Sequence, residues 1–187
     1  ISFIPGLIAV GCDDKSITIW EPSRSKPLGT LLGHTNKVSC VAWANDKRRL
    51  LSASYDHSVF IWEGVQRRLL KTLKGHTQKV LVAVWSPDGK KIASGSEDKT
   101  VRVWDSFSAS CLGSFIAHTG AVLSLTWSFD GKKLASGGWD KTIKIWEGLQ
   151  GDSHHKLNLW EKYDILGLKR NCLKENGLKP EGLEVSR

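Results

Sequence analysis

The chain has 187 residues, a formal net charge of +8, and a composition of 40% hydrophobic and 25% charged residues. These values are typical of a globular protein and exclude an intrinsically disordered chain. No apolar run approaches the roughly 20 residues of a membrane-spanning helix, so we expect no membrane segment. The first ten residues carry no basic leader or small-residue cleavage site, so we expect no signal peptide.

The cysteines, the histidines and the lack of methionine bear on the location of the protein, on metal binding and on whether the chain is a fragment. Four cysteines lie far apart without a Cys-x-x-Cys pair, which favours reduced thiols and a cytoplasmic or nuclear location. The adjacent His154 and His155 have no accompanying ligand cluster, so we expect no metal site. Because the chain contains no methionine, we interpret it as a fragment of a longer protein or a processed product.

In chain order, the first predicted element is a pair of short strands within residues 7–20. Asp14 stands in the turn before the second of these strands, at the register position of the aspartates in the later periods. The unit then recurs three times in steps of 42 residues, which indicates a repeat architecture. The residues that keep this step are Trp20, Trp62, Trp104 and Trp146; Asp14, Asp56, Asp98 and Asp140; Trp43, Trp85 and Trp127; His34, His76 and His118; and Ser52, Ser94 and Ser136.

Each full period predicts four short strands and no helix. Runs such as SVFIW and TVRVW are rich in β-branched residues, and each follows a turn that contains an aspartate. The segments SPDGKK and SFDGKK carry the Asp-Gly signal of a β-hairpin between two apolar stretches.

Short motifs at fixed places in the period lead to a family resemblance. Gly-His pairs stand at Gly33-His34 and Gly75-His76, and the periods end in Trp-Glu or Trp-Asp, as at Trp104-Asp105. Together with the period, these motifs resemble the WD-repeat β-propeller family over roughly residues 7–147. The third period departs from the pattern, because Ala117 replaces the glycine before His118.

The resemblance implies an all-β fold, a partial propeller of about three and a half blades within residues 1–147. Each blade is expected to take its outermost strand from the end of the preceding repeat. The expected units are a half blade at 7–20 and complete four-stranded blades at 27–62, 68–104 and 111–146.

The expected blades do not close a ring, because propellers have typically four to eight blades. We therefore expect the missing blades to come from a longer chain. Two copies would bring together enough strands for seven blades, so oligomerisation stays open. Two half blades would not complement each other neatly, and dimeric closure is not favoured.

The repeat ends at about Gly148, and residues 148–187 are expected to form a C-terminal extension that is helical or disordered. A three-residue step from Leu157 through Trp160 and Tyr163 gives a modest helical pattern, which Gly167 interrupts. The pattern leaves two interpretations open, a docking helix and a terminal extension without a role in the fold.

His34, Ser52 and Asp56 are the residue types of a hydrolytic triad. The same set recurs in every period, whereas catalysis needs one site. The resemblance implies instead a chain of hydrogen bonds from a tryptophan to the serine, the histidine and the aspartate. We therefore expect structural tetrads, no catalytic residue and no cofactor. Their members are His34, Ser52, Asp56 and Trp62; His76, Ser94, Asp98 and Trp104; and His118, Ser136, Asp140 and Trp146.

Binding is expected at loop positions that vary between the periods. The end of the blades that carries the histidine loops and the aspartate turns is, by the resemblance, the usual docking face. Trp139 lies outside the tryptophan register, and either anchors a partner or folds onto a neighbouring blade. The partner-binding candidates at this end are Lys37, Tyr55, Lys79, Glu97 and Trp139.

The opposite end of the blades carries a band of basic residues that could meet RNA, a ribosomal surface or an acidic partner. Asp46, Asp88 and Asp130 partly offset it, and aromatic residues do not interleave with it, so a solvated face is favoured. The basic residues are Lys47, Arg48, Arg49, Arg67, Arg68, Lys90, Lys91, Lys132 and Lys133.

The favoured function is a non-catalytic scaffold that binds other proteins in a multiprotein complex, without a membrane role. The first alternative is an RNA- or ribosome-associated module that uses the basic end. A hydrolase and a truncated product without independent function are the remaining alternatives.

Overall fold

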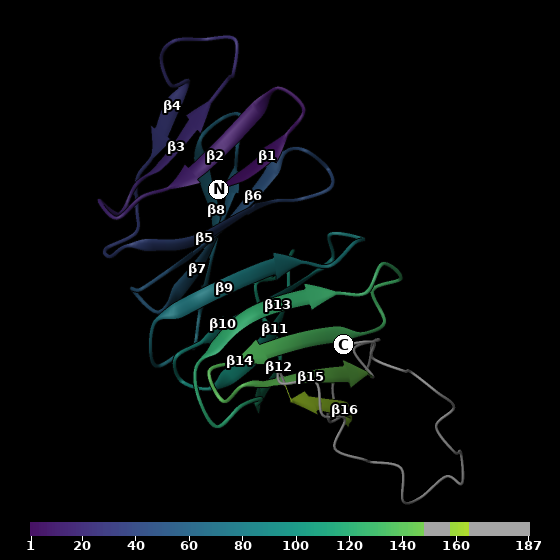
Figure 1. Cartoon of the computed structure of the whole chain (residues 1–187). Coiled ribbons are helices and arrows are strands. Elements are labelled where there is room, and N and C mark those ends of the chain that lie inside the picture. The colour runs from purple at the N-terminus through teal and green to yellow at the C-terminus, as the bar shows by residue number, and fades with distance from the viewer. Residues whose placement is uncertain (148–157, 165–187) are drawn as a thin grey trace, which may run out of the picture.

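The structure is a computed structural model that describes residues 1–147 and, in its backbone, residues 158–164. These residues form sixteen strands in four antiparallel sheets, each of four strands. The sheets follow one another in chain order and do not close into a ring within the described part of the chain (Figure 1). The all-β, partial-propeller architecture expected from the sequence is therefore confirmed.

Within each sheet the strands are adjacent in the order in which they occur along the chain. The first sheet consists of β1 (Ser2–Ile4), β2 (Leu7–Gly11), β3 (Ile17–Trp20) and β4 (Gly29–Leu31). The second consists of β5 (Val38–Trp43), β6 (Arg49–Ser54), β7 (Ser58–Glu63) and β8 (Arg68–Lys74). The third consists of β9 (Val80–Trp85), β10 (Lys91–Ser96), β11 (Thr100–Asp105) and β12 (Cys111–Ile116). The fourth consists of β13 (Val122–Trp127), β14 (Leu134–Gly138), β15 (Thr142–Glu147) and β16 (Asn158–Asp164).

The blade boundaries expected from the sequence are wrong by one strand. β4 pairs with β3 of the same sheet, and β8 pairs with β7 across a short turn, with Arg68 opposite Glu63. The chain therefore passes from one sheet to the next in the histidine loop, as between β8 and β9. A short turn brings consecutive strands into antiparallel pairing, which decides the phasing.

The segment 7–20 is not a half blade, because β1 and β4 complete its sheet. The expected helix is also wrong for residues 158–164, which form β16 and pair with β15. The open edge of β15 offers unpaired backbone groups, and their hydrogen bonding outweighs a weak helical pattern. The rest of the expected extension, residues 148–157 and 165–187, lies outside the described residues.

The core consists of three apolar clusters, one between each pair of successive sheets. Side chains alternate between the two faces of a strand, so each inner sheet contributes one face to each of two clusters. The innermost strands β5, β9 and β13 lie beside one another (Figure 1). Ser39 of β5 donates a hydrogen bond of 2.6 Å to the Val80 carbonyl, and the Trp85 indole donates one of 3.0 Å to the Ala42 carbonyl.

Candidate functional site

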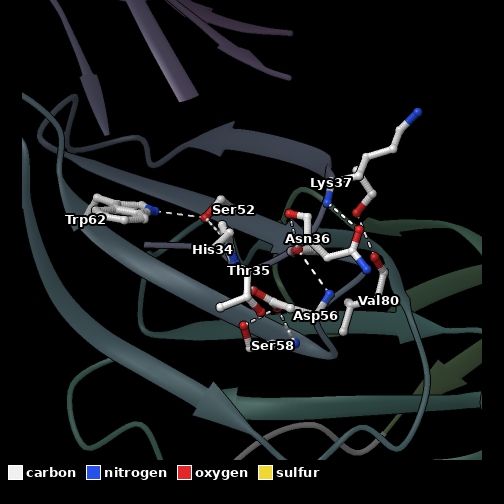
Figure 2. A network of polar contacts seen from close by, with 11 residues as sticks. His34, Thr35, Asn36, Lys37, Ser52, Asp56, Ser58, Trp62 and Val80 are labelled. Carbon is white, nitrogen blue, oxygen red and sulfur yellow. Dashed lines mark hydrogen bonds and ion pairs between the residues drawn. The ribbon is translucent and has the colours of Figure 1, made fainter. Parts of the chain in front are cut away.

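A chain of hydrogen bonds runs through the interior of the second sheet (Figure 2). The Trp62 indole donates to Ser52 Oγ at 2.8 Å, and Ser52 Oγ lies 2.7 Å from His34 Nε2. His34 Nδ1 lies 2.7 Å from Asp56 Oδ2. The chain ties the loop before β5 to the turn between β6 and β7.

The third and fourth sheets repeat this arrangement with nearly the same distances, at register positions 42 residues further on. In the third sheet the distances are 2.8 Å for Trp104–Ser94, 2.8 Å for Ser94–His76 and 2.8 Å for His76–Asp98. In the fourth sheet they are 2.9 Å for Trp146–Ser136, 2.8 Å for Ser136–His118 and 3.0 Å for His118–Asp140. All twelve residues named from the sequence therefore lie in three equivalent networks.

Each network has a fifth member that the sequence analysis missed. The residue two positions after each aspartate donates its hydroxyl to Oδ1, at 2.5 Å from Ser58, 2.6 Å from Thr100 and 2.7 Å from Thr142. The backbone N–H of each of these residues donates to the same oxygen. The signal was present in the sequence, because a hydroxyl residue stands at every one of these register positions.

The protonation states follow from burial and hydrogen bonding. Burial alone would raise the pKa of Asp98, but donation from Thr100, His76 and the Thr77 N–H outweighs it and lowers the pKa to about 2. The pKa of Asp56 and that of Asp140 also lie well below the usual range for the same reasons. Burial lowers the pKa of His76, although the nearby carboxylate partly opposes the change.

A neutral histidine fits the donors and acceptors of the network. Nδ1–H donates to the ionised carboxylate, Nε2 accepts the serine O–H, and the serine oxygen accepts the indole N–H. Each N–H and O–H group that links the four side chains of the network then has an acceptor. Such a network is stabilising in an interior from which water is excluded.

The same distances would suit a Ser-His-Asp triad, but burial excludes that role for these serines. Ser52 and Ser94 are 0% exposed and Ser136 is 1% exposed. Each hydroxyl is held between an indole and an imidazole, so a substrate could not reach it without unfolding the sheet. A nucleophile must lie in a site open to its substrate.

The candidate binding residues meet in a row across the end of the sheets that carries the histidine loops. Lys37 Nζ lies 2.7 Å from Asp13 Oδ1 and 5.8 Å from the centre of the Tyr55 ring. Lys79 Nζ lies 5.0 Å from the same ring and 3.2 Å from Glu97 Oε1. This charged row, which consists of Asp13, Lys37, Tyr55, Lys79 and Glu97, links the first three sheets. Asp13 is its one member that the sequence analysis did not name.

Trp139 occupies the register position of Tyr55 and Glu97 in the fourth sheet, and it is 72% exposed. Its backbone N–H donates to the Ala121 carbonyl at 2.8 Å, which fixes the turn. Its register equivalent Tyr55 contacts Lys79 of the following sheet, and no sheet follows the fourth within the described residues, so the exposure is compatible with both interpretations left open by the sequence.

Comparison with known proteins assigns the family. The model of the WD domain, G-beta repeat, matches residues 25–63, 67–105 and 109–147. These three segments make up more than half of the chain, and they carry the period and networks described above. The chain belongs to the WD-repeat family.

Individual WD-repeat proteins match over short segments. The chain is 46% identical over 49 residues to a WD repeat-containing protein 26 homolog of Drosophila melanogaster, covering 26% of this chain and 8% of that protein. It is 39% identical over 49 residues to a WD repeat-containing protein WDS homolog of Arabidopsis thaliana, covering 26% and 9%. It is 34% identical over 50 residues to the guanine nucleotide-binding protein G(I)/G(S)/G(T) subunit beta-1 of Homarus americanus, covering 27% and 15%.

The matched segment is thus a small part of each of these relatives. WD repeats generally mediate protein–protein interaction, and proteins built from them are generally non-catalytic scaffolds. Within the described residues, histidines, cysteines and carboxylates form no group of three or more that could hold a metal ion. The part of the chain that the structure describes also contains no helix long and apolar enough to cross a membrane.

Arg49, at the basic end of this WD-repeat chain, uses its side chain for contacts within the protein. Its guanidinium lies 4.7 Å from the Trp85 ring and 5.3 Å from the Phe107 ring, and it donates to the Gly89 carbonyl at 3.0 Å. Arg49 Nε also lies 2.6 Å from Asp46. The side chain therefore joins the second sheet to the third.

Other members of the basic band have neighbouring acceptors. Lys133 lies 3.0 Å from Glu147, and Arg67 donates to the Leu28 carbonyl. The backbone N–H groups of Lys90 and Lys132 donate to the aspartates of their own hairpins. The Glu147 carboxylate and the hairpin carboxylates of Asp88 and Asp130 place negative charge beside these lysines, which weakens a long-range field toward an anionic partner.

Proposed function

We propose that this chain is a non-catalytic scaffold that binds another protein, within a multiprotein complex, through the charged row and Trp139. The observation that carries the proposal is the 72% exposure of Trp139 on the same end of the sheets as the row. An exposed indole can be fully desolvated by a partner, and tryptophan is enriched among residues that dominate binding energy.

The charged row supports the same proposal through its geometry. Its side chains are held by one another, since Lys37 and Lys79 both contact the Tyr55 ring and each also pairs with a carboxylate. A surface ordered before binding loses less side-chain entropy when a partner docks. The row would therefore contribute specificity and orientation, while Trp139 contributes most of the binding energy.

The absence of a catalytic role is part of the proposal and rests on the burial of the three serines. The RNA-associated alternative is less well supported, because three of the basic residues at the opposite end, Arg49, Lys133 and Arg67, have acidic or carbonyl neighbours. A cytoplasmic or nuclear location stays a proposal that rests on the spacing of the cysteines in the sequence.

Affinity capture from cell extract, after mild cross-linking and with quantitative mass spectrometry, tests the proposal. The Trp139→Ala variant should lose the specific partners at least tenfold, because a central tryptophan is worth roughly 2 kcal/mol or more. The matched control is Phe129→Ala, since Phe129 is 98% exposed and lies in a hairpin at the opposite end of the sheets. Equal recovery of the partners by wild type and Trp139→Ala would contradict the proposed surface.

A further inference from the structure

The charged row changes where the third sheet meets the fourth. At each of the two preceding junctions between sheets, a lysine lies between a turn residue of the preceding sheet and a turn residue of its own sheet. At the third junction Ala121 stands at that register position. We infer that a lysine of a partner protein places its ammonium group there, between the Glu97 carboxylate and the Trp139 ring. This inference rests on the proposed function and adds the chemistry of the partner.

The first junction is the template for this site. Lys37 Nζ lies 2.7 Å from Asp13 Oδ1 of the first sheet and 5.8 Å from the centre of the Tyr55 ring of its own sheet. Two periods further on, the same three positions hold Glu97, Ala121 and Trp139. The acid and the aromatic ring are thus retained at the third junction, whereas a methyl group replaces the lysine side chain.

The backbone is arranged alike at the two junctions. The Tyr55 N–H donates to the Lys37 carbonyl at 2.9 Å. The Trp139 N–H donates to the Ala121 carbonyl at 2.8 Å. The loop of Ala121 is therefore held against the turn of Trp139 as the loop of Lys37 is held against the turn of Tyr55.

The loop beside Trp139 has small residues where the second sheet has long ones. Gly120 and Ala121 stand at the register positions of Asn36 and Lys37. A Cβ atom added at Gly120 would lie 3.1 Å from the Trp139 Cβ, so the loop backbone runs directly beside this side chain. At these two positions no side chain longer than a methyl group stands between the indole and a partner.

The chemistry of the corner suits an ammonium group. Lys79 Nζ lies 3.2 Å from Glu97 Oε1, and a carboxylate has a second oxygen, Oε2, that can accept from another cation. Tryptophan is the aromatic side chain that attracts cations most strongly, and Trp139 is 72% exposed. Both cations already in the row are lysines, so we assign the partner residue as lysine.

The inference does not depend on what lies beyond the fourth sheet. The Tyr55 ring contacts Lys37 of its own sheet at 5.8 Å and Lys79 of the following sheet at 5.0 Å. An aromatic ring at this register can therefore meet one cation from each of two sheets. The lysine of the partner takes the position beside the loop of Trp139 itself, and the third and fourth sheets that form this corner both lie within the described residues.

Affinity capture of the partners that depend on Trp139 tests the inference through a change of charge alone. Glu97→Gln keeps the size of the side chain and removes its charge, so capture should fall about fivefold or more. The matched control is Glu147→Gln, which should capture as wild type does. Glu147 also pairs with a lysine, at 3.0 Å, and its side chain is 40% exposed against 31% for Glu97, but it lies at the opposite end of the sheets.

Zero-length cross-linking identifies the cation itself. A carbodiimide joins a carboxylate to an amine that contacts it. Mass spectrometry of the captured complex should find Glu97 joined to a lysine of the partner protein, beside the internal link between Glu97 and Lys79 that serves as a positive control. Trp139→Ala should lose the link to the partner and keep the internal one.

Three outcomes would overturn the inference while the proposed function stands. The first is equal capture of the Trp139-dependent partners by wild type and Glu97→Gln. The second is cross-links from Glu97 that reach only Lys79, and the third is cross-links that reach a lysine of a second, isotope-labelled copy of this chain. Equal capture by wild type and Trp139→Ala would instead contradict the proposed function, and the inference with it.

Discussion

The Nδ1 atom of His76 lies 2.8 Å from the Oδ2 atom of Asp98, and the side chains of both residues are almost fully enclosed. The same carboxylate accepts the Thr77 N–H at 3.1 Å and the Thr100 hydroxyl at 2.6 Å. Asp98 thus gathers donors from the loop before β9 and from the start of β11. Its negative charge is what holds the two segments together.

Replacing Asp98 by alanine should therefore destabilise the chain strongly. Each buried donor left without an acceptor costs about 1–3 kcal/mol, and we expect a loss of roughly 3 kcal/mol in the free energy of unfolding. The melting temperature should fall by about 6–12 °C for a chain of this length. Urea and thermal unfolding, followed by tryptophan fluorescence, measure both values.

The matched control for this substitution is Asp13→Ala, because the Asp13 side chain is 80% exposed in its ion pair with Lys37. An exposed pair contributes about 0–1 kcal/mol, so this variant should melt close to wild type. Equal stability of Asp98→Ala and wild type would show that the network does not stabilise the fold.

Stability should fall as the pH decreases below neutrality. Burial holds the pKa of His76 below its usual value of 6.5, and burial likewise lowers the pKa of His118. Below pH 6.5 the unfolded chain therefore takes up protons before the folded chain does, and the free energy of unfolding decreases. The contribution of these histidines is fully present only above that pH.

A second loss of stability is expected at more acidic pH. The pKa of Asp98 falls from 3.8 to about 2 in the folded chain, so its contribution is present above pH 3.8 and is lost between these values. Urea unfolding across the acid range measures both steps. Stability that stays constant or rises from pH 7 to pH 5 would contradict the protonation states assigned here.

The chain should not hydrolyse esters through its serines. Ser94 is 0% exposed, and its oxygen already lies 2.8 Å from both the Trp104 indole and His76 Nε2. A chromogenic acetate ester should therefore be cleaved at equal rates with wild type and with Ser94→Ala. A burst or steady rate that only wild type shows would indicate an accessible nucleophile.

Arg49 and Arg48 should respond differently to alanine substitution, although they are neighbours in sequence. Loss of Arg49 removes two aromatic contacts and the hydrogen bond to Gly89, and should cost about 2 kcal/mol of unfolding free energy. Arg48 is exposed, and its substitution should change stability by less than about 0.5 kcal/mol. Thermal unfolding measures both effects. Equal melting temperatures of the two variants would contradict the stabilising role of the Arg49 side chain.

RNA affinity should be weak at the basic end. Fluorescence anisotropy with single-stranded RNA at low salt should give no saturable binding, because neighbouring carboxylates offset the lysines. Strong binding that falls steeply with salt, and that Lys90→Ala and Lys132→Ala both reduce, would favour the RNA-associated alternative. Trp139→Ala serves as the control, since it lies at the other end.

The sequence by itself determined the repeat, the strands within each period and the members of the buried networks. These features recur at a fixed step, so His34, Ser52 and Asp56 can be matched to their counterparts without knowledge of distant contacts. A hydroxyl residue also recurs two positions after each aspartate. The pattern alone did not show that this hydroxyl donates a hydrogen bond to the carboxylate.

Only the tertiary structure decided how the periods divide into sheets, because shifting the boundary by one strand leaves the sequence pattern unchanged. Backbone hydrogen bonding assigns β4 to β3, and β16 to β15 in place of an expected helix. Only the tertiary structure also showed that the Arg49 guanidinium contacts the rings of Trp85 and Phe107, which belong to the next sheet. A local pattern specifies which residues form a strand. Which strand it pairs with, and which groups contact a charged side chain, depend on contacts between distant segments.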